Sequence, residues 1–285
     1  MQTVDRYVVI GNPVAHSKSP EIHAQFAAAT EQSITYQRLP AALDSFVATV
    51  HQFIAAGGRG ANVTVPFKQQ ACQLATRLTE RAAVAAAVNT LTFDGTEIIG
   101  DNTDGAGLVT DLISNAGIPL QGRRILLLGA GGAARGVLQP LLLQNPARLV
   151  LANRTATRAQ DLVHDFAAYP ALEFAELDQL VGSFDLIINA TSASLQQQLP
   201  ALPTTVFGTG TFAYDMMYGA QPTVFMQFAA EHGARVRDGL GMLVEQAAEA
   251  FFVWRGVRPQ TASVYRCLRA QLSPQLPTQP PVQKA

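Results

Sequence analysis

A regular alternation of apolar strands and helices between residues 123 and 239 limits the folds open to this chain more than any other feature. Runs such as "RRILLLGA", "ARLVLANR", "FDLIINAT" and "TFAYDM" have apolar centres, and helix-forming stretches separate most of them. Strands that are buried on both faces read as continuous apolar runs, and helices usually connect parallel strands. This half of the sequence therefore predicts an α/β fold whose parallel sheet is covered by helices on both faces.

The first hundred residues mix strands and helices less regularly. "RYVVIGNP" and "ANVTV" are predicted strands, and "NTLTFDGTEIIGD" is a predicted hairpin that turns at Asp94-Gly95. Helices are predicted over residues 19–32, 45–58, 68–78 and 104–117. The hairpin gives way to the last of these helices near residues 104–106, and we place a domain boundary there.

Two amphipathic stretches, "GMLVEQAAEAFFVWRG" and "TASVYRCLRAQL", predict helices near the end of the chain. We expect these helices to return and pack on the first domain. The sequence thus predicts one domain over residues 1–105, completed by residues 240–272, and a second domain over residues 106–239. Residues 273–285 are rich in Pro and Gln, which predicts a disordered tail.

Composition excludes several classes of protein. Of the 285 residues, 48% are hydrophobic and 14% are charged, and the net charge is −1, so neither disorder nor a nucleic-acid or membrane partner is expected. No apolar stretch approaches the roughly 18 residues of a membrane span, and the N-terminus lacks a signal peptide's apolar core. We therefore expect a cytoplasmic protein. Its two cysteines, Cys72 and Cys267, show no metal-ligand or redox spacing and are predicted to be reduced core thiols.

A glycine-rich turn follows the first strand of the second half. "ILLLGAGGAARG" contains Gly129, Gly131 and Ala134 in the pattern GxGxxA, between a predicted strand and a predicted helix. Glycines let the backbone approach a pyrophosphate, and the unpaired N–H groups at the helix start attract its charge. The pattern predicts a dinucleotide site; the alternative is a tight turn that binds no ligand.

The tip of the next strand indicates which dinucleotide binds. NAD sites place an Asp or Glu there to hold the ribose 2′-hydroxyl. This chain instead has "NRTATR", with Asn153, Arg154, Thr155 and Arg158. Guanidinium groups suit a phosphate, so we predict NADP. The alternative is a solvated helix start with surface arginines, although cations at a helix N-terminus oppose the helix dipole.

Two hydroxyl groups stand at the start of the first predicted helix. In "HSKSPEIH", Ser19 precedes Pro20, a residue that suits the first helical position, so Ser19 reads as a helix cap. Ser17 has no such explanation. Together the two serines are candidates for holding a small anion such as a carboxylate, with the simple cap as the alternative.

Lys68 directly follows a predicted buried strand, in "GANVTVPFK". Ligands of α/β proteins bind at the carboxyl ends of strands, so a lysine there is a candidate active-site residue. Asp104, in "GDNTDG", stands just ahead of a predicted helix, where an Asp usually serves as a cap. If the two side chains meet in a cleft, they can share and move a proton.

These motifs together resemble the shikimate dehydrogenase family. "GNPVAHSKSP", "GANVTVPFK", "AVNTL", "GDNTDG", "GAGGAARG", "NRT", "NATS" and "DGLGMLVEQAA" occur in the family's order, from residue 11 to about residue 257. The resemblance implies an N-terminal α/β substrate domain, a Rossmann-like doubly wound NADP-binding domain and a cleft between them. It implies NADP-linked reduction of 3-dehydroshikimate to shikimate, in the pathway to aromatic amino acids.

The resemblance also implies a role for individual residues. It makes Lys68 the catalytic lysine and Asp104 its carboxylate partner. It assigns the substrate's hydroxyls and carboxylate to Ser17, Ser19, Thr64, Asn89, Tyr218 and Gln246. It assigns the pyrophosphate to Gly129, Ala130, Gly131, Gly132 and Ala133, and the 2′-phosphate to Asn153, Arg154, Thr155 and Arg158. Further cofactor contacts are implied for Met216, Gly239 and Glu80.

Two loops depart from the family pattern. Ala193 and Ser194 follow "NATS" where the family usually has a glycine, and Pro222-Thr223-Val224 replaces a usual Thr-Pro pair. Two alternatives to the implied function remain open: an enzyme with a broader range that includes quinate, and a catalytically silent NADP-binding regulator. The sequence does not decide the oligomeric state, for which a homodimer is one option.

Overall fold

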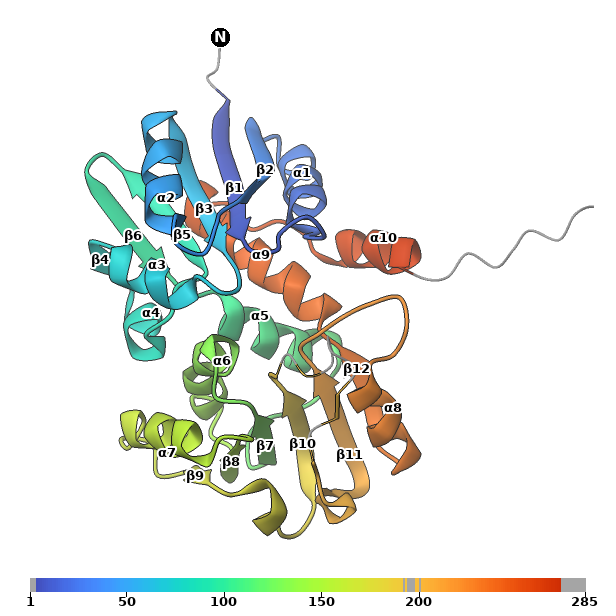
Figure 1. The fold of residues 1–285 in the computed structure, drawn as a ribbon. Coiled ribbons are helices and arrows are strands. Elements are labelled where there is room, and N and C mark those ends of the chain that lie inside the picture. The colour runs from blue at the N-terminus through green and yellow to red at the C-terminus, as the bar shows by residue number, and fades with distance from the viewer. Residues whose placement is uncertain (1–3, 192, 194–197, 200, 273–285) are drawn as a thin grey trace, which may run out of the picture.

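The computed structural model describes residues 4–191, 193, 198–199 and 201–272. Two β-sheets lie one above the other, and helices α5 and α9 run between them (Figure 1). The predicted disordered tail and Ser194 lie outside the described residues. Among the described residues, no helix is both long and apolar enough to cross a bilayer.

The first half of the chain forms a mixed sheet in the order β2-β1-β3-β5-β6-β4. Strand β1 runs parallel to β2 and β3, whereas β5 runs antiparallel to β3 and β6. Its strands are β1 Asp5–Gly11, β2 Ile34–Pro40, β3 Gly58–Val63, β4 Arg77–Leu78, β5 Thr90–Asp94 and β6 Glu97–Asp101. Its helices are α1 Ser19–Ala29, α2 Phe46–Ala55, α3 Lys68–Leu74 and α4 Glu80–Ala85.

Several predicted elements in this half need correction. The predicted strand at "ANVTV" ends at Val63, and the Val65 side chain is 60% exposed instead of buried. The predicted helix over residues 68–78 stops at Leu74, because the chain then enters β4, which pairs with β6. Strands β2 and β4 and helix α4 were not predicted. Strand β2 lies at the edge of the sheet and has no fully buried residue, and the other two elements are very short.

The second half confirms the predicted parallel sheet. Its order is β12-β11-β10-β7-β8-β9, and all of its pairings are parallel. Apolar clusters cover both faces, so the strands are buried on each side. Its strands are β7 Arg124–Leu128, β8 Arg148–Ala152, β9 Leu172–Phe174, β10 Phe184–Asn189, β11 Phe207–Asp215 and β12 Arg235–Asp238, and its helices are α6 Gly132–Leu142, α7 Ala156–Asp165 and α8 Val224–Glu231.

This strand order is that of a doubly wound nucleotide-binding sheet. The chain leaves β7 toward β8 and β9 on one side and later adds β10, β11 and β12 on the other. The direction of winding therefore reverses between β7 and β10. Ligands of such sheets bind at the carboxyl ends of the strands beside this reversal, which is where the glycine-rich turn after β7 lies.

The two predicted C-terminal helices are present as α9 Leu240–Arg255 and α10 Ala262–Leu272, and both pack against α1. Ile22 and Phe26 of α1 are fully buried in one apolar cluster with Val244 and Phe251 of α9 and Leu268 of α10. The two cysteines are free thiols, as predicted, but only Cys72 lies near a core: it is partly buried and packs against the apolar cluster of the first sheet, whereas Cys267 is exposed.

A buried ion pair joins helix α5 Asp104–Thr110 to the second sheet. The helix continues into a π-helical turn, Asp111–Asn115, and the Asp111 side chain is fully buried. Its carboxylate accepts hydrogen bonds from Arg237 at 2.6 and 2.9 Å and from the Tyr214 hydroxyl at 2.8 Å. A side chain at Gly241 would lie 1.9 Å from the Asp111 Oδ1 atom, so α9 packs directly against this pair.

We expect Asp111→Ala to lower the free energy of unfolding by about 3–5 kcal/mol, because it leaves Arg237 and Tyr214 without their buried partner. Urea denaturation measures this loss. Glu97→Ala is the control, because Glu97 pairs with Arg77 on the surface and such pairs contribute little. Equal midpoints for the two variants would show that the buried pair does not stabilise the fold.

Candidate active site

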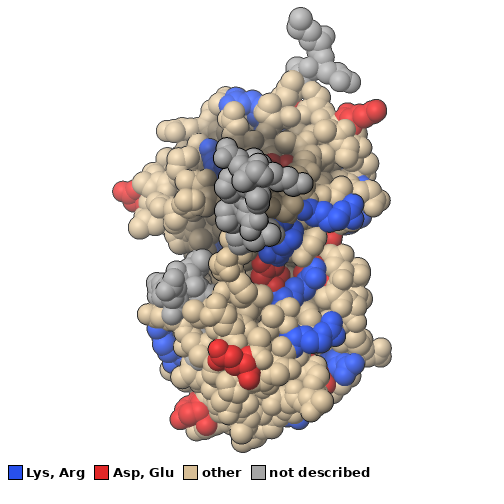
Figure 2. Space-filling view, turned by 90° about the vertical axis from the view of Figure 1, so that its right-hand side faces the viewer, with Lys and Arg blue, Asp and Glu red and all other residues tan. Residues whose placement is uncertain are grey.

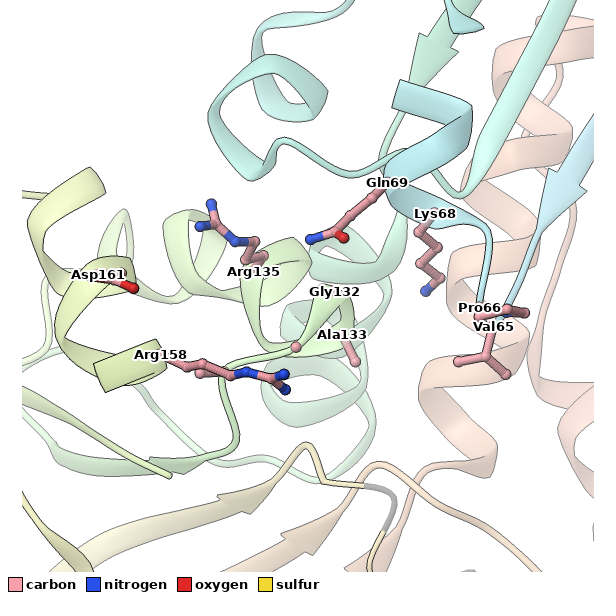
Figure 3. A pocket seen from close by; sticks show the side chains of 11 residues that line it. Val65, Pro66, Lys68, Gln69, Gly132, Ala133, Arg135, Arg158 and Asp161 are labelled. Atoms are coloured by element: carbon pink, nitrogen blue, oxygen red, sulfur yellow. The ribbon is translucent and has the colours of Figure 1, made fainter. Parts of the chain in front are cut away.

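A pocket of about 460 Å³ lies between the two halves of the chain. Figure 3 shows its walls, with α3 on one side and the starts of α6 and α7 on the other. The first half contributes Val65, Pro66, Lys68 and Gln69, and the second contributes Ala130, Gly131, Gly132, Ala133, Arg135, Arg158 and Asp161. A Cβ atom at Gly132 would lie 3.8 Å from that of Lys68. The catalytic candidate therefore faces the glycine-rich turn directly.

The glycine-rich turn has the geometry that a pyrophosphate site requires. Gly129 has a φ of +110°, a conformation that other residues rarely adopt. Gly131 caps α6, and a Cβ atom there would meet nothing within 4 Å, so the space in front of the helix is open. Because the first N–H groups of α6 lack intrahelical partners, this open space suits the phosphates of NADP.

The "NRTATR" segment joins the end of β8 to α7. Arg158 lines the pocket, and the Asn153 amide donates to the Thr155 carbonyl at 2.9 Å, which holds the turn. Arg154 is exposed and is not among the described residues that line the pocket. Within the segment, Arg154 and Arg158 are positively charged and no residue carries a carboxylate. This set of donors fits the 2′-phosphate of NADP.

Lys68 and Asp104 meet, although 36 residues separate them in sequence. Lys68 begins α3, Asp104 begins α5, and the Lys68 Nζ atom lies 2.5 Å from the Asp104 Oδ2 atom. The two side chains are 17% and 8% exposed, respectively. Thr103, not Asp104, occupies the cap position of α5, so the Asp104 carboxylate is engaged by Lys68 instead of capping the helix.

Asn89 holds the second oxygen of the Asp104 carboxylate. Its Nδ2 atom lies 2.8 Å from the Asp104 Oδ1 atom and 3.3 Å from the Oε1 atom of Gln246 on α9. Asn89 is itself 2% exposed, and its Oδ1 atom accepts from the Thr103 N–H at 2.8 Å. Four of the predicted site residues, from four separate segments of the chain, thus form one hydrogen-bonded group.

The two serines also lie together. The Ser17 and Ser19 Oγ atoms are 3.2 Å apart, and Ser17 also accepts from the Ser19 N–H at 3.3 Å. Lys18 occupies the cap position of α1 and no side chain caps it, so the simple cap reading of Ser19 does not hold. Arg38 of β2 donates to the Ser17 carbonyl from two nitrogens, at 2.6 and 2.9 Å. This arrangement sets two hydroxyls beside a cation, which suits a carboxylate ligand.

Tyr36 and His23 pack beneath the two serines as neutral aromatic rings. The rings stack with centroids 4.2 Å apart. Burial lowers the pKa of His23 to about 3 and raises the pKa of Tyr36, with the Ser19 side chain acting against the second effect. Neither ring therefore carries a charge that competes with the ligand.

The remaining predicted residues lie at strand ends or helix starts. Thr64 follows β3, and a Cβ atom at Gly11 would lie 2.4 Å from its methyl group. Met216 follows β11 and is 8% exposed; its carbonyl oxygen approaches Gly239 so closely that a Cβ atom there would lie 2.2 Å away. Tyr218 packs against the cluster of α1 and α9, and burial raises its pKa.

Glu80 is less closely tied to the pocket. It is the exposed first residue of α4, where the negative charge of an acidic side chain interacts favourably with the helix dipole. Of the residues that the structure describes, those lining the pocket do not include it.

In the second departing loop, Thr223 caps α8 and donates to Asp215 at 2.6 Å, so the altered sequence still starts the helix normally.

Sequence reasoning missed several residues of the site. Arg38 and Tyr36 lie on β2, whose alternating "ITYQRLP" is a signal that could have identified the strand. Gln69 follows Lys68 and points into the pocket, and Arg135 lines it while paired with Asp165 at 2.6 Å (Figure 3). Asn62 and Thr90 read as ordinary strand residues, and no local signal marks them.

Figure 2 shows how charged side chains are distributed over one face of the molecule. On the face drawn in Figure 2, positive and negative side chains lie beside one another near the waist between the two halves. Neither sign covers a continuous surface in that view, which agrees with the net charge of −1.

Family models match three successive parts of the chain. They are the shikimate dehydrogenase substrate binding domain over residues 9–91, shikimate / quinate 5-dehydrogenase over residues 111–197, and the shikimate 5′-dehydrogenase C-terminal domain over residues 239–269. A curated shikimate dehydrogenase (NADP(+)) from Herminiimonas arsenicoxydans is 63% identical over 268 residues, which is 94% of this chain and 98% of that protein. The chain belongs to the shikimate dehydrogenase family.

Further relatives and solved structures agree with this chain in sequence and fold. The shikimate dehydrogenase (NADP(+)) of Dechloromonas aromatica is 58% identical over 94% of this chain and 98% of its own. A crystal structure of an Ael1 enzyme from Pseudomonas putida is 48% identical, covers 94% of this chain and 98% of its own, and superposes with a TM-score of 0.88. A Thermus thermophilus shikimate 5-dehydrogenase in complex with NADP(H) and shikimate is 31% identical over 94% of this chain and all of its own, with a TM-score of 0.84.

Proposed function

We propose that this chain catalyses the reversible, NADPH-dependent reduction of 3-dehydroshikimate to shikimate, in the pathway to aromatic amino acids. The observation that carries the proposal is the Lys68–Asp104 pair, which lies opposite the glycine-rich turn of a nucleotide-binding sheet. Curated relatives that share more than half of its sequence are named for this activity. A spectrophotometric assay of shikimate oxidation with NADP and with NAD tests the proposal.

The protein's part in the reaction is to position the reactants and handle one proton. Bound NADPH supplies the hydride for the substrate's C3 carbonyl. Lys68 donates a proton to the carbonyl oxygen during reduction and removes it during oxidation, and its ammonium group polarises the C–O bond. Asp104 holds Lys68 in place through its Oδ2 atom and balances its charge.

The substrate's other groups determine its orientation. Ser17 and Ser19 hold the carboxylate, beside the guanidinium of Arg38. Thr64, Asn89, Tyr218 and Gln246 receive the ring hydroxyls. Because all of these contacts except Tyr218 lie on the first half and on α9, we assign the substrate to that side of the pocket. The glycine-rich turn and the "NRTATR" segment then hold the cofactor on the other, with Met216 and Gly239 near its nicotinamide and Glu80 as a further cofactor contact.

We expect Asp104→Asn to lower kcat and to change its dependence on pH, because the amide keeps the shape but cannot carry the charge that balances Lys68. General acid–base groups typically contribute about 10²- to 10⁴-fold, and a partner of such a group contributes part of that factor. The measurement is a pH–rate series beside a melting curve. An unchanged rate with a lowered melting temperature would show that Asp104 serves the fold alone.

Two alternatives and several further properties are open to direct tests. Comparing kcat/KM for shikimate and quinate separates a shikimate enzyme from one with a broader range. Any turnover excludes a silent regulator. We propose the domain limits given above, with residues 1–105 and 240–272 on the substrate side and 106–239 on the cofactor side. We also propose a cytoplasmic location and treat the homodimer as an assembly to be measured by light scattering.

A further inference from the structure

A chain of polar side chains runs behind the Lys68–Asp104 pair, through the first sheet. Tyr36 of β2 donates to the Asn62 Oδ1 atom at 2.8 Å, and the Asn62 amide nitrogen lies 3.1 Å from the Thr90 hydroxyl. The Thr90 hydroxyl lies 2.8 Å from the Asn89 Oδ1 atom, and Asn89 reaches Asp104 at 2.8 Å. Thr90 is fully buried, and Asn62 and Asn89 are 6% and 2% exposed.

Two backbone groups fix the direction of the hydrogen bonds in this row of side chains. The Asn62 Nδ2 atom also lies 3.2 Å from the Asn89 carbonyl oxygen, which can only accept, so the nitrogen side of that amide faces Thr90. The Thr103 N–H can only donate, and it lies 2.8 Å from the Asn89 Oδ1 atom, so the oxygen side of that amide also faces Thr90. The Thr90 hydroxyl must therefore accept from Asn62 and donate to Asn89.

The consequence reaches the catalytic pair. With its oxygen satisfied by Thr90 and Thr103, Asn89 presents its NH₂ group to Asp104. An amide N–H stabilises a carboxylate anion, whereas an amide oxygen in the same place would repel it. Each hydrogen bond in the row from Tyr36 to Asn89 thus has its donor directed toward Asp104. Hydrogen bonds aligned in this way strengthen one another in a buried setting.

We propose that Thr90 is a positioning residue for the reaction: together with the Thr103 N–H, its hydroxyl holds the oxygen of the Asn89 amide, so that the NH₂ group of Asn89 stays on Asp104 and keeps that carboxylate in place beside Lys68. The inference rests on the function proposed above. It assigns a role to a residue that is not among the described residues lining the pocket and whose hydrogen bonds there go to Asn62, Asn89 and Thr103.

The test compares Thr90→Val, which keeps the shape and removes the hydroxyl, with Thr90→Ser, which keeps the hydroxyl. We expect Thr90→Val to lower kcat roughly tenfold, with the KM for NADPH unchanged, and Thr90→Ser to restore most of the rate. Thr90→Ala gives the same comparison if the valine variant does not fold. Cofactor binding, followed by NADPH fluorescence, shows that each variant is folded without using its activity.

A matched control separates this role from the general effect of losing a buried hydroxyl. Thr211 of β11 is 1% exposed, donates to the Phe184 carbonyl at 2.7 Å and accepts from the Gly208 N–H at 2.9 Å. It lies in the other sheet, away from the pocket. Thr211→Val should lower the melting temperature as Thr90→Val does and leave kcat unchanged.

A double substitution tests whether Thr90 acts through the carboxylate. In an Asp104→Asn background, Thr90→Val should reduce kcat by less than twofold, because the group that it helps to hold is already gone. A full tenfold loss in that background would overturn the inference, as would equal kcat values for Thr90→Val and Thr211→Val, or a loss confined to the KM for shikimate. Absence of shikimate turnover in the unaltered chain would overturn the proposed function itself, and this inference with it.

Discussion

Replacing Lys68 with alanine is expected to remove most turnover and to leave NADPH binding nearly intact. The lysine lies on the first half of the chain, across the pocket from the glycine-rich turn and the "NRTATR" segment. In the mechanism that we propose, Lys68 acts on the substrate's reacting oxygen, so its loss should lower kcat by about 10²- to 10⁴-fold. The Kd for NADPH should change by less than about twofold, since no cofactor contact is lost.

The measurement pairs steady-state kinetics with NADPH fluorescence titration. Gln70→Ala is the control, because Gln70 is an exposed neighbour on the same helix and should leave both quantities unchanged. Lys68→Gln keeps a hydrogen-bond donor near Asp104 and protects against a variant that misfolds. A kcat for Lys68→Ala within a few-fold of the unaltered enzyme would remove Lys68 from the chemistry.

Replacing the arginines of the "NRTATR" segment is expected to weaken NADPH far more than NADH. Hydrogen bonds to charged groups are worth roughly 1.5–3 kcal/mol net, so Arg154→Ala should reduce the preference for NADPH by about 10- to 150-fold. NADH lacks the 2′-phosphate, and its KM should scarcely change. Because Arg158 lines the pocket and can cover part of the loss, Arg154 and Arg158 replaced together should cost more than either alone.

Ionic strength and a control variant sharpen this test. The preference of the unaltered enzyme for NADPH should fall as salt rises, because salt screens an exposed ion pair. Arg123→Ala is the control, because Arg123 pairs with Asp185 before β7, at the other end of that strand from the glycine-rich turn. Equal losses for NADPH and NADH would mean that Arg154 supports the fold and does not bind the phosphate.

The second sheet was predictable because its signal is local. Each strand is an apolar run, each helix follows a short turn, and the glycine pattern after β7 has a physical cause that holds wherever it occurs. The first sheet was predicted less well. Its edge strand β2 has no fully buried residue and therefore no apolar run, and Val65 lines the pocket instead of continuing β3.

The site divides in the same way. The residues that we propose to bind phosphate stand within short motifs, so the sequence predicts them together. The contact between Lys68 and Asp104 depends on how β3 and β6 pair with β5 in the sheet, and no local pattern reports that pairing. The role of Thr90 depends on the direction of individual hydrogen bonds, which only the arrangement of Asn62, Asn89 and Thr103 reveals.

The return of α9 and α10 to the first half has a consequence for synthesis on the ribosome. Ile22 and Phe26 emerge early, yet the side chains that bury them belong to residues 240–268, more than two hundred positions later. The first half therefore cannot complete its apolar core while the second is being made, and contacts so distant in sequence form slowly. The nucleotide-binding sheet, whose strands follow one another along the chain, can form before the half that precedes it.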